Sequence, residues 1–147
     1  MYILIVEDDL RQYEFIKKSL IDEDEFSDLR IDRIPTESGF RQRINEFETD
    51  RPDVIVMDVM LRWTDPSPDM TAAPEEVERD GFYRAGIRCV ELLAKNPRLD
   101  NIPILIHSVL DKDDLESSYL NGFPQVKHIE KTFEPQKLAR AVRSITR

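Results

Sequence analysis

Acidic side chains follow two apolar, strand-like segments of this sequence. Glu7, Asp8 and Asp9 come directly after the run YILIV, and Asp58 interrupts the run DVIVMDVML. Aspartate is uncommon in strands, and an unpaired charge is costly to bury. If the two segments are neighbouring strands, their carboxylates repel one another unless a cation lies among them. Mg²⁺, which takes few protein oxygens and keeps several waters, fits such a site.

Two further polar side chains follow later apolar segments. Ser108 ends the segment IPILIHS, and Lys131 comes directly after the segment VKHIE. Each of these polar residues alone is as readily a helix cap or a surface side chain. All of them, however, fall at the carboxyl ends of predicted strands. A divalent cation and a lysine can neutralise the oxygens of a phosphoryl group while a carboxylate attacks the phosphorus. The joint pattern therefore indicates phosphoryl chemistry.

The elements that would position these side chains alternate along the chain. We expect strands at residues 2–6, 29–34, 54–57, 104–107 and 126–130, and helices around residues 13–20, 40–47, 86–95, 111–121 and from 135 onward. Strand–helix alternation predicts an α/β fold, a doubly wound (βα)₅ parallel sheet. The first, third and fourth strands are almost wholly apolar and therefore central. The flavodoxin-like order 2-1-3-4-5 follows, with ligands at the carboxyl edge between strands one and three.

Local signals support several of the expected helix ends. Asp9 is a candidate N-cap of the first helix, and Gln12 three residues later completes a capping box. Pro135 suits the first turn of the last helix. The sequence Pro74-Glu75-Glu76 also resembles a first helical turn, so a part of its segment is expected to be helical.

Composition limits the classes of function. The chain has 147 residues, a net charge of −9 and a pI near 4.8, which suit one soluble domain. No basic patch stands out, so direct binding of nucleic acid is not expected. Cys89 is the single cysteine and has no partner for a disulfide within the chain. We see no signal peptide and no apolar stretch of membrane length. A cytoplasmic protein that does not bind membranes is expected.

The segments ILIVEDD, DVIVMDVML, IPILIHS and HIEKTF resemble the receiver domain of two-component response regulators, and the resemblance covers nearly the whole chain. It implies that Asp58 is the phosphoacceptor. It also implies a Mg²⁺ site in which Asp8 binds directly, Glu7 acts through water, and Met60 offers its backbone carbonyl. Asp9 is then a helix cap and not a ligand.

The resemblance assigns roles to three more residues. Ser108 would bond one phosphoryl oxygen, and Lys131 would pair with another. His128 stands at the switch position, where the family usually has an aromatic residue; it is either a switch residue or a plain surface residue. The same resemblance implies that phosphorylation draws Ser108 inward and changes the face formed by the last two helices and the fifth strand.

The sequence departs from the family around two of these residues. Lys131 is followed by Thr132 and not by the usual proline. A cis bond at a non-proline residue costs about 3–4 kcal/mol, so the state of this peptide bond is left open. Arg62 replaces the usual proline after the metal loop, and it begins an insertion at about 62–85. Gly86 then fits the family's glycine before the third helix.

Two interpretations of the insertion at 62–85 stand side by side. It is either a tolerated surface loop, since long loops cost little entropy, or a lid or docking element beside Asp58. We expect it to affect the choice of partner more than folding. The domain would then be a single receiver domain over 1–147 that carries this inserted loop.

The most direct interpretation is a single-domain response regulator in a phosphorelay. Asp58 would take a phosphoryl group from a sensor histidine kinase or a histidine phosphotransfer protein. Output would pass to a separate effector bound to the changed face, or the protein would relay the phosphoryl group onward. We expect a monomer or weak homodimer. The protein would catalyse its own phosphorylation and not act as a turnover enzyme.

Two alternatives remain open at this point. A pseudo-receiver would use the same fold as a binding module that is never phosphorylated. A Mg²⁺-dependent aspartyl-phosphate phosphatase of the haloacid-dehalogenase type needs a second aspartate two residues after its nucleophile. Met60 occupies that position here, which argues against such a phosphatase. The resemblance to receiver domains implies that Met60 and Leu110, both apolar, flank the path of the hydrolytic water, so we expect a long-lived acyl phosphate.

Overall fold

The computed structural model describes residues 1–147 apart from 25, 27, 67–71, 112, 115–116 and 147. Its centre is a five-stranded parallel sheet in the order β2-β1-β3-β4-β5. The strands are β1 (Tyr2–Val6), β2 (Arg30–Ile34), β3 (Val54–Met57), β4 (Ile104–Ser108) and β5 (Val126–Glu130). The predicted fold class and strand order are therefore confirmed.

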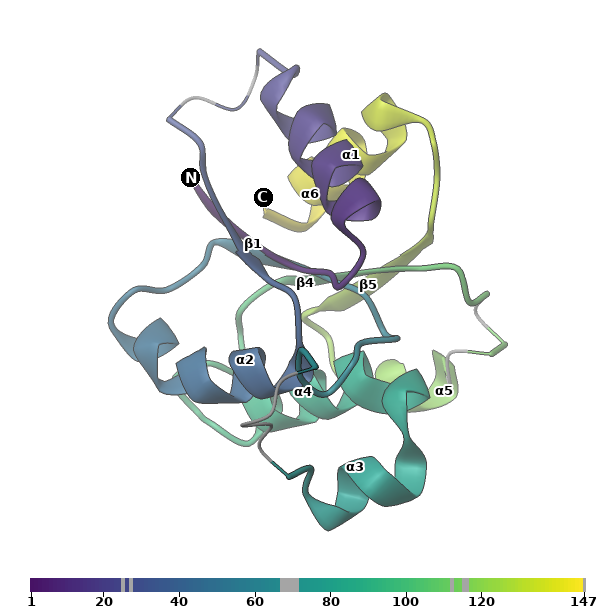
Figure 1. Ribbon diagram of the computed structural model, residues 1–147. Helices are drawn as coiled ribbons and strands as arrows, with labels where there is room; N and C mark the ends of the chain where they lie inside the picture. Colours follow the sequence, from purple (N-terminus) through teal and green to yellow (C-terminus); the bar gives the residue numbers. More distant parts are fainter. Residues whose placement is uncertain (25, 27, 67–71, 112, 115–116, 147) are drawn as a thin grey trace.

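Helices cover both faces of this sheet. They are α1 (Leu10–Ile21), α2 (Glu37–Arg43), α3 (Glu75–Asp80), α4 (Ala85–Ala94), α5 (Ser117–Leu120) and α6 (Pro135–Thr146), with 3₁₀ turns at η1 (Ile44–Glu48) and η2 (Phe82–Arg84). Helices α1 and α6 lie together on one face, and α2, α4 and α5 lie on the other (Figure 1). None of the helices in the described part of the chain is long and apolar enough to cross a membrane.

The side chains of the central strands divide into two apolar cores. On the face toward α2 and α4, Leu4, Ile55 and Ile104 pack with residues of those helices. On the other face, residues such as Ile3 and Val56 pack against α1 and α6. This alternation follows from the two-residue period of a strand. Strands β1, β3 and β4 are buried over their whole lengths, whereas β2 and β5 at the edges are only partly buried, as predicted.

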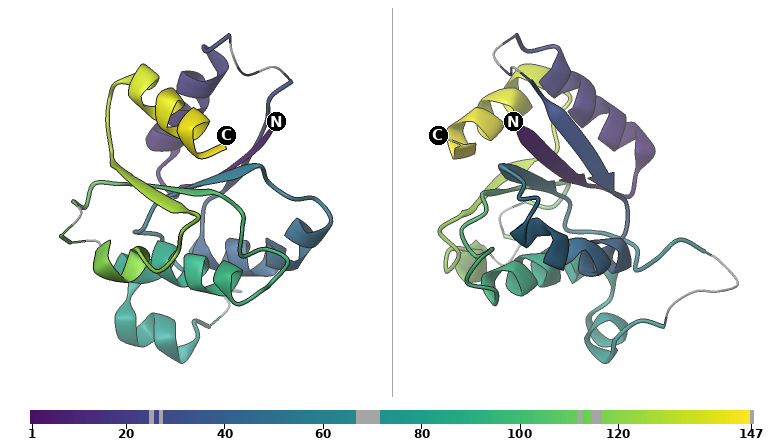
Figure 2. Two further views of the ribbon diagram at one scale, coloured as in Figure 1. Left: turned by 180° about the vertical axis from the view of Figure 1, so that it is seen from behind. Right: turned by 90° about the vertical axis from the view of Figure 1, so that its left-hand side faces the viewer.

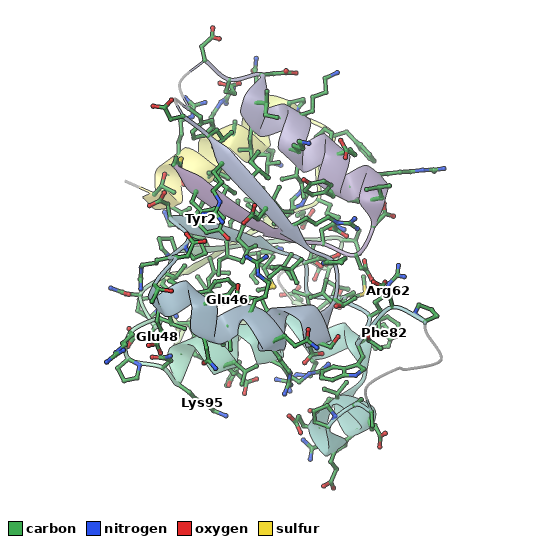
Figure 3. The ribbon with its side chains drawn as sticks, turned by 60° about the vertical axis from the view of Figure 1, so that its left-hand side comes forward. Tyr2, Glu46, Glu48, Arg62, Phe82 and Lys95 are labelled. Atoms are coloured by element: carbon green, nitrogen blue, oxygen red, sulfur yellow. The ribbon has the colours of Figure 1, made fainter. Side chains whose placement is uncertain are left out.

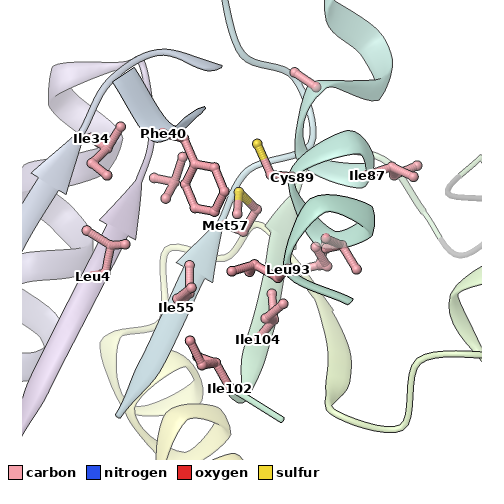
Figure 4. Packing of buried hydrophobic residues seen from close by; sticks show 14 of the residues in the cluster. Leu4, Ile34, Phe40, Ile55, Met57, Ile87, Cys89, Leu93, Ile102 and Ile104 are labelled. Carbon is pink, nitrogen blue, oxygen red and sulfur yellow. The ribbon is translucent and has the colours of Figure 1, made fainter. Parts of the chain in front are cut away.

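The sheet gives the molecule two different ends. Tyr2, at the start of β1, lies at one end in Figure 3, and Arg62 and Phe82 lie toward the other. Figure 4 shows the first core from nearby, with Phe40 of α2 and Cys89 of α4 close to Met57 at the end of β3. Cys89 is fully buried, and burial raises the pKa of its thiol.

The helix predicted over 111–121 is wrong for much of its length. In the described residues the α-helix spans Ser117–Leu120, while 113–114 form a turn and 112 and 115–116 lie outside the described residues. One Asp111 carboxylate oxygen accepts hydrogen bonds from the amides of Asp113 and Asp114 at 2.9 Å each. Aspartate often closes a local turn in this way, in competition with helix formation.

Two smaller expectations need correction as well. The second helical pattern is split, because α2 ends at Arg43 and Ile44–Glu48 form a 3₁₀ turn. Phe40 and Phe47 are nevertheless both buried and in ring contact, as the pattern indicated. Asp9 caps α1, but its own amide donates to Glu7 Oε1 at 3.0 Å and not to a glutamine side chain. The capping box is therefore incomplete.

An ion pair between Arg41 and the partly exposed Glu76 joins the inserted segment to a buried ion-pair network between α2 and α4. The carboxylate of Glu37 on α2 accepts from Arg88 of α4 at 2.7 and 2.9 Å and from Arg41 at 2.9 Å. Arg41 also reaches Glu76 of α3 at 3.1 Å, and Val77 of α3 is buried. Both views of Figure 2 place α3 on the outer side of α2 and α4, away from the sheet. The predicted helical turn at Pro74 is confirmed as the start of α3.

Candidate functional site

Three carboxylates meet where β1 and β3 end. The amide of Asp58 donates to the carbonyl of Val6 at 2.9 Å, which continues the ladder between the two strands. Asp58 therefore lies beside Glu7 and Asp8, the residues that follow β1. One carboxylate oxygen from each of these three residues lies within 4.8 Å of the others. The predicted acidic cluster is thus present, with Glu7 and Asp58 buried and Asp8 partly exposed.

Lys131 completes this cluster from the end of β5. Its Nζ lies 2.9 Å from Asp58 Oδ2 and 3.0 Å from Glu7 Oε2. The amide of Lys131 donates to the carbonyl of Ser108 at 2.8 Å, so β4 fixes its backbone. The bond to Thr132 is trans, since the described residues contain no cis peptide bond. The ammonium group reaches the acids without the usual cis proline.

Burial and neighbouring charges shift the pKa values of Glu7, Asp58 and Lys131. Burial, and next the Asp58 carboxylate, raise the pKa of Glu7 to about 7. Burial also raises the pKa of Asp58, although Lys131 offsets part of that effect. Burial by itself would lower the pKa of Lys131, but Asp58 and Glu7 outweigh it and leave that pKa raised. The buried acids are therefore incompletely neutralised by one lysine.

The loop after Asp58 is held on two sides. The Met60 amide donates to Asp58 Oδ1 at 3.3 Å, and the Gly86 amide donates to the Val59 carbonyl at 2.8 Å. A Cβ atom on Gly86 would lie 2.3 Å from the Asp58 carbonyl oxygen and 2.7 Å from the Val59 Cα. Only glycine allows this close approach of α4 to the loop. The glycine identified from the sequence thus positions the backbone of Asp58.

Ser108 and His128 lie on the neighbouring strands. Ser108 is fully buried at the end of β4, and its Oγ accepts a hydrogen bond from the Leu110 amide at 3.3 Å. His128 is half-buried on β5, in register with Ile106. Strand order places Ser108 at the same carboxyl edge as Asp58. The roles expected for Ser108, His128 and the Met60 carbonyl stay predictions.

Arginines also contact the acidic loop, and the sequence reasoning gave them no role there. Arg33, near the end of β2, donates to the carbonyls of Glu7 and Asp8 at 3.1 Å each. The Arg62 amide donates to Asp8 Oδ2 at 3.3 Å, and its Nε lies 3.7 Å from the same oxygen. The position of Arg33 at the carboxyl end of an edge strand was a usable signal, because that strand neighbours β1.

His107 is a second residue that the sequence reasoning passed over. It precedes Ser108 on β4 and is only 1% exposed. Neither ring nitrogen has a hydrogen-bond partner in the described part of the chain. Burial, and next the charge of Lys131, lower the pKa of His107 to about 4. The ring is therefore neutral at physiological pH and adds no positive charge near the acids.

The donor set at this edge fits a hard divalent cation. Glu7, Asp8 and Asp58 offer carboxylate oxygens only, and such oxygens are the ligands that Mg²⁺ and similar ions prefer. Burial, and next repulsion from Asp58, raise the pKa of Glu7 to about 7 although Lys131 lies 3.0 Å away. A cation bound here would supply positive charge and lower the repulsion among the carboxylates.

Comparisons with solved structures give the fold. The phosphorylated cyanobacterial phytochrome response regulator RcpA aligns with a TM-score of 0.66 and 19% identity, over 98% of this chain and 89% of that one. The Mn²⁺-bound response regulator Rcp1 aligns with a TM-score of 0.61 and 21% identity, over 98% and 90%. A signal receiver domain from Clostridium thermocellum aligns with a TM-score of 0.71 and 18% identity, over 99% and 97%.

Comparisons of the sequence alone identify no family for this chain. No protein-family profile matches the chain, and no curated protein matches it. The identities to the solved structures are low, so the likeness establishes architecture and not chemistry. Strand order, helix layers and near-complete coverage agree in these alignments. The protein therefore has the flavodoxin-like fold of response-regulator receiver domains.

Proposed function

We propose that this protein is a response-regulator receiver that accepts a phosphoryl group on Asp58. One observation carries the proposal: Asp58 lies 2.9 Å from the Lys131 ammonium within a cluster of three carboxylates at the carboxyl edge of the sheet. A buried aspartate with one lysine and two further acids is poorly arranged for stability alone. It is well arranged to attack a phosphorus atom once a cation is present.

The reaction follows from the positions of these groups. An oxygen of ionised Asp58 attacks the phosphorus of a phosphohistidine, the P–N bond breaks, and the imidazole leaves and takes up a proton. A divalent cation among Glu7, Asp8 and Asp58 supplies charge neutralisation for the phosphoryl oxygens. Lys131 already lies beside Asp58, so its ammonium needs only a small movement to pair with a phosphoryl oxygen. Lys131, together with a cation held by Glu7, Asp8 and Asp58, would offset the negative charge of the phosphoryl oxygens that these carboxylates repel.

The switch uses Ser108 and the strand beyond it. The Ser108 hydroxyl accepts a hydrogen bond from the Leu110 amide, and the Ser108 carbonyl accepts from the Lys131 amide. A phosphoryl oxygen that recruits this hydroxyl changes both the β4–α5 loop and the end of β5. His128 lies on β5, two residues before the end of that strand and in register with Ile106 of β4. The changed face of α5, β5 and α6 is then read by a separate effector protein.

The partners and the metal follow from the same proposal. The phosphodonor is a sensor histidine kinase or a histidine phosphotransfer protein, as for the two-component systems named among the similar structures. Rcp1 was solved with Mn²⁺ and RcpA in a phosphorylated form. These two proteins support the proposal that this chain binds a divalent cation, here Mg²⁺, and is phosphorylated. The protein acts in the cytoplasm as a switch and not as a turnover enzyme.

Incubation with acetyl phosphate and Mg²⁺, followed by intact-protein and peptide mass spectrometry, tests this function. We expect one added phosphoryl group on the peptide that contains Asp58. The adduct should be absent from Asp58→Asn and present in Asp100→Asn, which alters an exposed aspartate elsewhere. Absence of any adduct would favour a pseudo-receiver, and rapid release of phosphate without an adduct would favour a phosphatase.

A further inference from the structure

The inserted segment presents an exposed aromatic pair. Phe82 and Tyr83 form the turn η2 between α3 and α4, and they are 50% and 60% exposed. Their rings are stacked on each other, with centroids 4.2 Å apart and planes 28° apart. Most large apolar side chains of this protein are buried, so two adjacent exposed rings form an unusual surface.

Rigid contacts hold this pair in place. Gly81 has a φ of 73°, a conformation that favours glycine, and it turns the chain sharply out of α3. The Gly81 carbonyl accepts a hydrogen bond from buried Arg88 at 2.8 Å. The Phe82 carbonyl accepts from the Leu61 amide at 3.3 Å, in the loop that follows Asp58. The rings are therefore displayed on a fixed turn, which lowers the entropy lost when a partner binds.

The segment that carries the pair has an excess of acidic residues, since α3 and η2 together contain Glu75, Glu76, Glu78 and Asp80 against Arg79 and Arg84. Arg79 lies 3.0 Å from an Asp80 carboxylate oxygen, and Arg84 is within 3.6 Å of Asp80. Glu75 and Glu78 of α3 are exposed, and neither has an ion-pair partner among the residues that the structure describes. The protein as a whole carries a net charge of −9. A partner that meets these rings therefore gains most if it is basic.

The pair also adjoins the phosphoacceptor loop. Leu61 bonds to Phe82 three residues after Asp58, and Gly86 packs on the Asp58 backbone three residues after Tyr83. Figure 3 shows Phe82 on the same side of the molecule as Arg62, which approaches Asp8. A protein that brings a donor group to Asp58 can contact these rings at the same time.

We propose that Phe82 and Tyr83 form a docking site for an amphipathic protein segment that carries apolar and basic side chains. Given the function proposed above, this segment belongs to the phosphodonor, and the insertion selects that donor. Aromatic side chains commonly dominate the affinity of such interfaces, and exposed acids around them favour a basic partner.

A synthetic peptide of leucine and lysine in an amphipathic helical pattern is the probe. Its binding to the full chain is measured by the anisotropy of a labelled peptide. We expect saturable binding, a Kd at least about tenfold higher for Phe82→Ser with Tyr83→Ser, and a Kd about threefold higher for Glu75→Gln with Glu78→Gln. A control variant, Ile21→Ser, removes an equally exposed apolar side chain at the far end of α1 and should leave the Kd unchanged.

A peptide with glutamate in place of lysine should not bind. Equal affinity of the lysine peptide for the wild type and the Phe82→Ser, Tyr83→Ser variant would overturn the docking site, as would equal binding of the two peptides. Acetyl phosphate labelling separates this result from the proposed function. The aromatic double variant should be labelled normally on Asp58, whereas Asp58→Asn should bind the peptide and remain unlabelled.

Discussion

Two buried groups of carboxylates in this protein are neutralised in different ways. At the carboxyl edge, Glu7 and Asp58 share the Lys131 ammonium, while Asp8 accepts from the Arg62 amide at 3.3 Å and has the Arg62 Nε at 3.7 Å. Between α2 and α4, fully buried Glu37 accepts hydrogen bonds from two arginines at 2.7 to 3.2 Å. The first group shares one buried ammonium, whereas both carboxylate oxygens of Glu37 accept from arginines.

The acidic cluster at the carboxyl edge is suited to binding a cation, whereas the ion pairs of Glu37 stabilise the fold. Burial of a charge is tolerated when close partners satisfy it, as the arginines do for Glu37. At the edge, burial and the neighbouring Asp58 carboxylate raise the pKa of Glu7, and Lys131 offsets part of that effect. The edge cluster thus has capacity for a cation, whereas the Glu37 cluster attaches α3 and α4 to α2. The predictions below use this contrast, in descending order of expected effect.

Loss of one arginine from the paired cluster should have the largest effect. Arg88→Met leaves the Glu37 carboxylate buried with Arg41 as its remaining close partner. We expect the free energy of unfolding to fall by about 3–5 kcal/mol, as for other buried pairs that lose one member. Urea denaturation followed by circular dichroism gives this value.

A double variant, Glu37→Leu with Arg88→Met, serves as the control for that change. It removes the charge together with its partner and should recover a large part of the lost stability. A fall of less than about 1 kcal/mol in Arg88→Met would show that the cluster is as weak as an exposed salt bridge.

Glu7 at the carboxyl edge should make the free energy of unfolding fall as the pH rises, because its pKa is raised in the folded state. Glu7 releases its proton near 4.5 when unfolded and at about 7 when folded, so its contribution is full below 4.5 and lost by about 7. The lowered pKa of His107 acts in the opposite direction over part of this range. The difference in unfolding free energy between wild type and Glu7→Gln isolates the first effect. That difference should fall as the pH rises from 4.5 to 7, and a constant difference would be contrary to the account.

The acidic cluster at the carboxyl edge also predicts the behaviour of metal binding. Asp8→Asn removes one of few ligands, so we expect the Mg²⁺ affinity to fall by about tenfold or more. Calorimetric titration at pH 8, where Glu7 is ionised, measures it. Glu76→Gln, which alters a carboxylate of the paired network, should leave the affinity unchanged. An unaltered affinity in Asp8→Asn would place the metal elsewhere.

The smallest expected effect concerns the lifetime of the acyl phosphate. Met60 and Leu110 are partly buried beside the Asp58 loop and the Ser108 hydroxyl, and neither can orient a water. Met60→Asn with Leu110→Glu should speed dephosphorylation several-fold by offering polar groups to a water. Decay of phosphorylated protein after removal of acetyl phosphate gives both rates. Equal or slower decay in the variant would point to another control of water access.

The sequence predicted the features that depend on the periodicity of apolar residues and on which residues follow each strand. Apolar runs such as Val54–Met57 predicted the central strands, and the acidic residues at the carboxyl ends of β1 and β3 predicted the acidic cluster. Resemblance identified Gly86, and the structure supplied its reason in the close approach to the Asp58 backbone. These features depend on residues near one another along one strand or across two strands of known order.

Other features depend on contacts that no local pattern contains. The pairing of Glu37 with Arg88 joins residues 51 positions apart, and either residue alone looks like an ordinary surface charge of a helix. The Asp111 turn occupies residues that the sequence pattern assigned to a helix, and the residues of the helix that forms begin only at Ser117. The attachment of α3 through Glu76 and Arg41 likewise requires the positions of α2 and α4 in space.

The central claim is that the edge cluster carries negative charge that the protein does not neutralise. It is tested most directly by the free energies of unfolding of Asp58→Asn and Glu37→Gln, measured by urea denaturation without divalent cations. We predict opposite signs: Asp58→Asn should be about 1 kcal/mol more stable than wild type, because repulsion is relieved, and Glu37→Gln about 2 kcal/mol less stable, because paired arginines lose their carboxylate. A loss of stability in Asp58→Asn as large as that in Glu37→Gln would contradict the account.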